Sequence, residues 1–155
     1  MTPEKEDFIK THFIPSLKTI SSESKPVWGK MTLQQMIEHF ADTMRVANGR
    51  AAVKIIITPE QNLQKMQDFI MSEKPFRENT LNALMPEIPA PVRNKTVEAA
   101  LKELEAEIRF FFSVFQNNKL QTSRNPFFGD LNFEQNVHLL YKHAVHHLRQ
   151  FSVEV

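Results

Sequence analysis

The chain has 155 residues, and its 19 Lys and Arg nearly balance its 18 Asp and Glu, which leaves a net charge of +1. It contains no cysteine and only three glycines, which lie far apart, so a disulfide scaffold, a thiolate zinc site, a cysteine nucleophile and a glycine-rich phosphate-binding loop are excluded. The balanced charge gives no field for holding DNA or RNA, whereas the six histidines are a surplus that requires an explanation.

The first residues of the chain predict a helix. Thr2 followed by Pro3 is typical of a helix N-cap with proline in the first turn. Apolar residues then recur at helical spacing: Phe8, Ile9, Phe13, Leu17 and Ile20. We expect this helix to be kinked or broken near Pro15, because proline lacks the N–H that an interior turn needs.

A second helix is marked at both ends. Thr32 and Gln35 have the spacing of a capping box, in which each side chain bonds the backbone of the other residue. Apolar residues follow at alternating spacings of four and three: Leu33, Ile37, Phe40, Met44 and Ala47. Gly49 is placed to end this helix in the left-handed conformation.

Residues 51–95 give the weakest periodic signal. Residues 53–57 are rich in β-branched side chains and fit either a short strand or an irregular packed segment. Residues 59–71 predict a short amphipathic helix, and the prolines beyond them exclude a continuous helix over residues 72–95. This last stretch is either a crossover packed on the other helices or a lid over a site.

Two further helices complete the pattern. Thr96 is an expected N-cap for the third, whose apolar stripe is Val97, Leu101, Leu104, Ile108, Phe111 and Phe115. Residues 125–130 read as a turn-rich loop. Asn132 and Gln135 are a second expected capping pair, and they begin a helix that runs nearly to the end of the sequence.

These elements predict an all-α fold, a four-helix bundle in one domain over residues 1–155. The distance between the second and third helices predicts a long crossover. No apolar run is long enough to span a bilayer, and the charged first residues do not fit a signal peptide. We therefore expect a soluble cytoplasmic protein.

The most informative histidines are His143 and His147 in the last predicted helix. Their separation of four residues places both imidazoles on one face, one turn apart, where they can bind one divalent metal. They also continue the apolar seam between Leu140 and Gln150, where an unpaired polar group is costly. The alternative is that a chain with six histidines produces this spacing by chance.

His39 lies beside the apolar stripe of the second predicted helix and can point toward the interior. With the pair it would make a three-histidine site that leaves positions open on the metal, as catalytic rather than structural sites do. The alternative for His39 is a buried histidine satisfied by one hydrogen bond. The remaining histidines are expected to be bystanders: His12 at the surface, His138 solvated or half-buried, and His146 at the rim of the site.

Two segments resemble the DinB-like superfamily (DinB/YfiT-like). Residues 28–42, WGKMTLQQMIEHFAD, are similar to the second-helix signature of that superfamily. Residues 141–151, YKHAVHHLRQF, are similar to its last helix, and the PFFG motif at 126–129 points to an uncharacterised branch. The resemblance is specific over about residues 26–49 and 125–152, and it concerns only the topology elsewhere.

The resemblance implies a four-helix bundle with a divalent transition metal on His39, His143 and His147. Zinc or nickel is favoured, although cobalt, copper and iron also accept imidazole. Asp42 and Gln150 are candidates to support the metal from behind its ligands, Asp42 by orienting His39 and Gln150 by contacting a metal-bound water or substrate. Characterised members include S-transferases and isomerases that use glutathione, mycothiol or bacillithiol, and many are dimers. Residues 58–95 match no known segment, so the resemblance implies no particular substrate.

These observations lead to three hypotheses about function. The first is a metal-dependent enzyme, a thiol S-transferase that acts on a small-molecule thiol and an electrophile and forms a homodimer. The second is a non-catalytic helical bundle that binds a small molecule among its 13 phenylalanines. A metal-dependent hydrolase is the weaker third hypothesis, because the sequence offers no obvious general base. Neither nucleic acid nor a membrane is expected as a partner.

Overall fold

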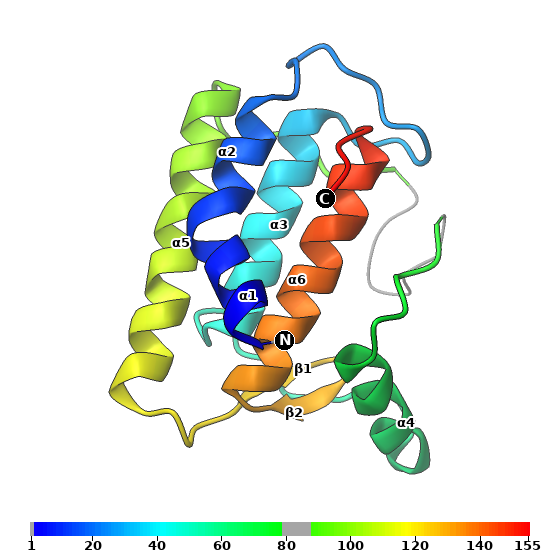
Figure 1. The fold of residues 1–155 in the computed structure, drawn as a ribbon, viewed down its shortest axis with the longest axis vertical. Helices are drawn as coiled ribbons and strands as arrows, with labels where there is room; N and C mark the ends of the chain where they lie inside the picture. Colours follow the sequence, from blue (N-terminus) through cyan, green and yellow to red (C-terminus); the bar gives the residue numbers. More distant parts are fainter. Residues whose placement is uncertain (1, 79–87) are drawn as a thin grey trace.

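The structure, a computed structural model, describes residues 2–78 and 88–155. Four helical segments of the described chain pack side by side (Figure 1). The first segment consists of α1 (Thr2–Asp7), η1 (Phe8–His12) and α2 (Phe13–Lys18), and the others are α3 (Leu33–Ala47), α5 (Val97–Asn117) and α6 (Phe133–Gln150). The predicted all-α four-helix bundle is confirmed.

The bundle core consists of the predicted apolar stripes. Members that are almost fully buried come from all four helical segments, among them Phe13, Leu33, Phe40, Leu104, Phe111 and Leu148. Each buried side chain of this size contributes about 1.5–3 kcal/mol through removal from water. The core therefore determines which sides of α3 and α6 point inward, and these are the two helices that carry the candidate ligands.

The first helix is interrupted near Pro15, as expected. The interruption lies over Phe8–His12, directly before the element that contains Pro15, and there the Phe13 N–H donates to the carbonyl of Phe8. A wider turn of this kind frees the backbone ahead of a proline, so Pro15 is accommodated just inside α2. The prediction for Thr2 is wrong: it is not an N-cap, because α1 already includes it and its hydroxyl donates to Glu134 at 2.8 Å.

The predicted ends of the other bundle helices are confirmed. Capping boxes are present at Thr32 with Gln35 and at Asn132 with Gln135. The Thr96 hydroxyl accepts a hydrogen bond from a backbone N–H of the first turn of α5. Gly49 has a φ of +85° just beyond α3, which is the left-handed conformation expected there.

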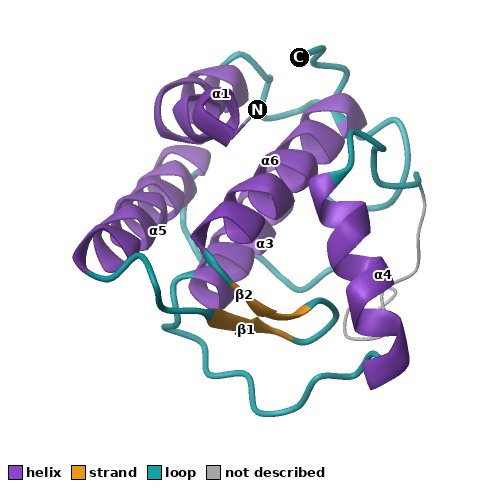
Figure 2. Ribbon diagram, turned by 60° about the horizontal axis from the view of Figure 1, so that its bottom comes forward, coloured by secondary structure: helices purple, strands orange, loops and turns teal. Residues whose placement is uncertain are grey.

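The crossover between α3 and α5 contains α4 (Glu60–Met71), which lies outside the bundle against α6 (Figure 2). Residues 53–57 form no strand. Strands occur instead where a loop was expected, as an antiparallel hairpin of β1 (Ser123–Asn125) and β2 (Gly129–Leu131). A second, smaller core joins α4, the hairpin and α6: Ile70, Phe128, Leu131 and Leu139.

The last part of the crossover is held against the bundle by hydrogen bonds to two carboxylates, the buried Glu38 and the half-buried Glu103. Glu38 on α3 is 4% exposed and accepts hydrogen bonds from the backbone N–H groups of Arg93 and Asn94, at 2.8 and 3.0 Å. The side chains of the same two residues bond Glu103 on α5, which also pairs with Arg45. Residues 93 and 94 are therefore packed against α3 and α5, which agrees with the interpretation of this part as a packed crossover.

Of the stretch that was interpreted as either a crossover or a lid, residues 79–87 lie outside the described residues. Within residues 2–78 and 88–155, no helix is long and apolar enough to cross a membrane.

Candidate metal centre

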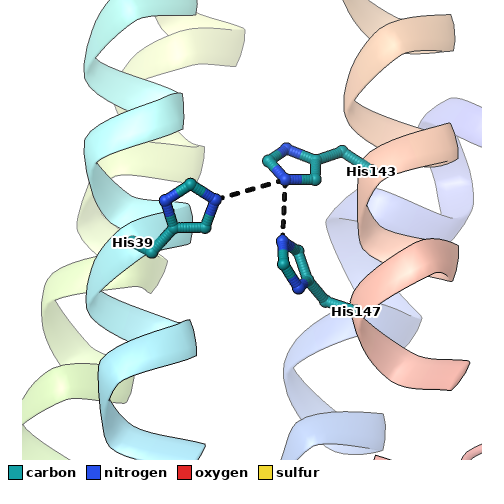
Figure 3. A group of neighbouring side chains, drawn as sticks. All are labelled: His39, His143 and His147. Atoms are coloured by element: carbon teal, nitrogen blue, oxygen red, sulfur yellow. Dashed lines mark hydrogen bonds between the residues drawn. The ribbon is translucent and has the colours of Figure 1, made fainter. Parts of the chain in front are cut away.

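Three imidazoles meet between α3 and α6 (Figure 3). His39 comes from α3, and His143 and His147 come from successive turns of α6. The Nε2 atom of His143 lies 3.3 Å from that of His39 and 2.8 Å from that of His147. One nitrogen from each ring lies within 4.8 Å of the others. The structure thus brings together the three histidines singled out by spacing.

Hydrogen bonds of the Gln150 amide determine which nitrogen of the His147 ring carries the proton. The amide nitrogen of Gln150 donates to the backbone carbonyl of Trp28 at 3.0 Å, which fixes the amide oxygen on the other side. That oxygen lies 2.8 Å from Nδ1 of His147, so Nδ1 must carry the proton and donate it. The Nε2 atom of His147 then presents a lone pair to the other two rings.

The loop that carries Trp28 approaches α6 closely because of a glycine. Gly29 has a φ of +77°, and a Cβ atom at this position would lie 3.0 Å from the side-chain nitrogen of Gln150. Any other residue would strain the backbone and press on the amide. The Val27 N–H donates to the backbone carbonyl of Gln150 at 2.7 Å, which fastens the same loop to the end of α6.

Burial keeps the three imidazoles neutral. It lowers the pKa of His143 and His147 well below the ordinary value of 6.5, and the neighbouring histidines add to the effect. Burial also lowers the pKa of His39, although the negative charge of Asp42 acts in the opposite direction and raises it. Neutral imidazole is the form that ligates a metal, so the cluster is ready for one near pH 7.

The spacing of the nitrogens fits a metal ion. Two imidazole nitrogens bound to one zinc at about 2.1 Å lie about 3.0 Å apart at a right angle and about 3.4 Å apart at a tetrahedral angle. The spacings of 2.8 and 3.3 Å around His143 lie close to these values. The Nε2 lone pair of His147, which faces this group, would be one of the ligands. The donor set is three nitrogens, which leaves room for an external ligand.

The model of one protein family, described as the DinB superfamily, matches residues 22–151. The chain belongs to the DinB superfamily. The matched range includes all of α3 and α6 and therefore His39, His143 and His147. Comparison with curated proteins and with solved structures finds no match.

The two expected supporting residues of this DinB superfamily protein behave differently. Gln150 bonds Nδ1 of His147 and so orients a candidate ligand. Its expected contact with a metal-bound water or substrate stays a prediction. Asp42 acts on His39 only through its charge, because its carboxylate pairs with Arg45 at 2.9 Å and Arg93 at 3.1 Å. Among the contacts of the described residues, none from Asp42 to His39 orients the imidazole, which was the expected role of Asp42.

The other histidines also differ in their surroundings. His12 is exposed, as expected, and His146 is half-buried with its ring 5.2 Å from that of His147, which places it at the rim. The expectation for His138 is wrong, because this residue is only 6% exposed. Packing of α1 covers it, and its Nε2 atom lies 2.8 Å from the Thr2 hydroxyl.

Three aromatic rings around the cluster were not singled out as functional from the sequence. The Phe40 ring lies 5.0 Å from that of His143, and the Phe76 ring lies 6.0 Å from it. The Trp28 ring lies 5.3 Å from that of His146. Phe40 was visible as part of an apolar stripe, whereas the position of Phe76 depends on a segment without periodicity.

Proposed function

We propose that the chain is a metal-dependent enzyme in which His39, His143 and His147 hold a divalent transition metal, zinc or nickel. The convergence of three buried or half-buried imidazole nitrogens carries this proposal. We further propose that the reaction is the transfer of a low-molecular-weight thiol to an electrophile. A divalent metal at this position would lower the pKa of a bound thiol and so supply a nucleophile at neutral pH.

The residues around the cluster favour thiol transfer over hydrolysis. Metal-dependent hydrolases commonly use a carboxylate as general base for the attacking water, but the carboxylates beside His39 are engaged elsewhere. Glu38 accepts backbone N–H groups of the crossover, and Asp42 pairs with Arg45 and Arg93. The chain has no cysteine, so the reacting thiol must come from a small molecule.

The proposed reaction balances without an added oxidant or reductant. The thiolate sulfur forms a bond to an electrophilic carbon of the second substrate, and the bond from that carbon to its leaving group breaks. The leaving group departs with the electron pair, and the thiol proton passes to solvent. The protein contributes binding, orientation and exclusion of water, for which the Phe40 and Phe76 rings beside His143 are placed.

A bimane assay tests the proposal. Protein loaded with Zn²⁺ or Ni²⁺ is mixed with monochlorobimane and with glutathione, mycothiol or bacillithiol, and fluorescence reports formation of the sulfur–carbon bond. We expect acceleration by the wild type with at least one thiol, loss of it in His143→Ala, and retention in His12→Ala. Equal rates for wild type and His143→Ala with all three thiols would contradict the proposed transfer and favour the non-catalytic binding bundle.

A further inference from the structure

A pocket of about 500 Å³ lies beside the histidine cluster, between α6, the loop that carries Trp28 and the segment after α4. This volume is in the range of small-molecule sites. Trp28, Phe76 and His146 are part of its lining, and the His146 ring lies 5.2 Å from that of His147. Two lining residues, Phe76 and His146, are thus in ring contact with His143 and His147 of the cluster.

Basic groups outnumber acidic groups in this pocket. The lysines and arginine among its lining residues are Lys5, Lys74, Lys142 and Arg149, against the acids Glu73 and Glu78. Lys5 pairs with Glu73 at 3.2 Å, which satisfies one cation. The chain as a whole carries a net charge of only +1, so the excess of positive charge at this place is local.

Lys142 is the unusual member of this group. It is 7% exposed, and its ammonium donates to the backbone carbonyls of Ser72, at 2.8 Å, and of Lys74. No carboxylate among the described residues lies within ion-pair distance of it. An ammonium has three N–H donors, and the two carbonyls accept two of them. The ammonium also lies 4.6 Å from the centre of the Phe69 ring, which is a cation–π contact. Without a carboxylate at ion-pair distance, this buried charge is still not neutralised, and an anionic ligand would offset part of the cost of burying it.

We propose that this pocket binds a small organic acid that has an apolar body. The Lys142 ammonium anchors the carboxylate, and Trp28 and Phe76 contact the apolar part. The proposal rests on the proposed function in so far as it names a substrate class for the metal centre. The binding itself needs only the side chains of the pocket.

The only tryptophan of the chain provides the measurement, because Trp28 lines the pocket. Its fluorescence is titrated with 3-phenylpropionate and, separately, with the neutral 3-phenylpropanamide, which has the same shape. The titrations use wild-type protein with and without Zn²⁺, and also His143→Ala. We expect the acid to bind about tenfold more tightly than the amide, as a charge-assisted hydrogen bond provides, in all three samples.

Substitutions identify the anchor. Lys142→Met removes the charge and should abolish the preference for the acid, while affinity for the amide is unchanged. Arg149→Gln, at an exposed position of the same pocket, should reduce the preference in part and does not disturb the core. Arg109→Gln is the matched control, because Arg109 is exposed on α5 and pairs with Glu105.

The outcomes separate this proposal from the proposed function. Equal affinity of wild type for acid and amide would overturn the acid site, whether or not Lys142→Met folds. A preference that survives in folded Lys142→Met and in Arg149→Gln would also overturn it. A preference that persists in His143→Ala, together with loss of metal binding there, supports the acid site independently of the metal centre. If the acid binds but no thiol transfer is found, only the proposed reaction fails.

Discussion

The side-chain oxygen of Gln150 lies 2.8 Å from Nδ1 of His147. Because the amide nitrogen is held by the Trp28 carbonyl, this contact leaves Nδ1 as the protonated nitrogen and Nε2 as the free lone pair. One amide therefore sets the tautomer and the ring orientation that a metal ligand needs.

Gln150→Leu should weaken metal binding about 10–100-fold, because loss of an outer partner of a ligating histidine typically has this effect. The affinity is measured by competition with a chromogenic chelator. The neighbouring exposed residue supplies the control, since Arg149→Gln should leave the affinity unchanged. Equal affinities for Gln150→Leu and wild type would show that the amide does not support His147.

Glu38→Ala should destabilise the protein by about 2–4 kcal/mol, because it leaves buried backbone N–H groups of the crossover without an acceptor. Urea unfolding measures the loss, and amide hydrogen exchange at Arg93 and Asn94 should become faster. Glu38→Gln keeps one acceptor oxygen and should cost less. Unchanged exchange at both amides in Glu38→Ala would mean that the carboxylate does not hold the crossover.

Stability should depend on pH through Glu103. Burial opposes its ionisation, but hydrogen bonds from Arg93, Arg45 and Asn94 outweigh burial and lower its pKa from 4.5 to about 2. A carboxylate whose pKa is lower in the folded state stabilises fully above pH 4.5, and this contribution is lost as the pH falls toward 2. Allowing for partial exposure, we expect Glu103 to contribute about 2 kcal/mol at pH 7.

The measurement compares urea unfolding of wild type and Glu103→Gln from pH 7 to pH 2. The difference in unfolding free energy should be constant above pH 4.5 and shrink below it. Glu105→Gln is the control, because Glu105 forms an exposed pair with Arg109 one turn away, and its effect should be much smaller. A difference that stays constant down to pH 2 would contradict the assignment.

Local sequence signals predicted the parts of the fold that local interactions determine. The capping boxes at Thr32 and Asn132 and the turn at Gly49 depend on residues a few positions apart, and all three are confirmed. The histidine cluster was foreseen for a similar reason, since a spacing of four fixes the face that His143 and His147 share. The apolar residues beside His39 face the core, so the same side of α3 faces α6 and places His39 next to His143 and His147.

What was missed depends on contacts between distant segments. Asp42 is drawn away from His39 by Arg93, which no pattern near residue 42 reveals. His138 is buried because α1 covers it, and the ammonium of Lys142 is buried under residues 72–74. The hairpin was missed because three-residue strands are too short to show alternation.

The metal content of purified protein tests the central claim most directly. Wild type and the variants His39→Ala, His143→Ala, His147→Ala and His12→Ala are expressed in medium supplemented with zinc and nickel and subjected to elemental analysis. We predict about one ion per chain in wild type and in His12→Ala, and less than about 0.1 in each of the other three. Equal content in wild type and in folded His39→Ala and His143→Ala would contradict a metal centre at these histidines.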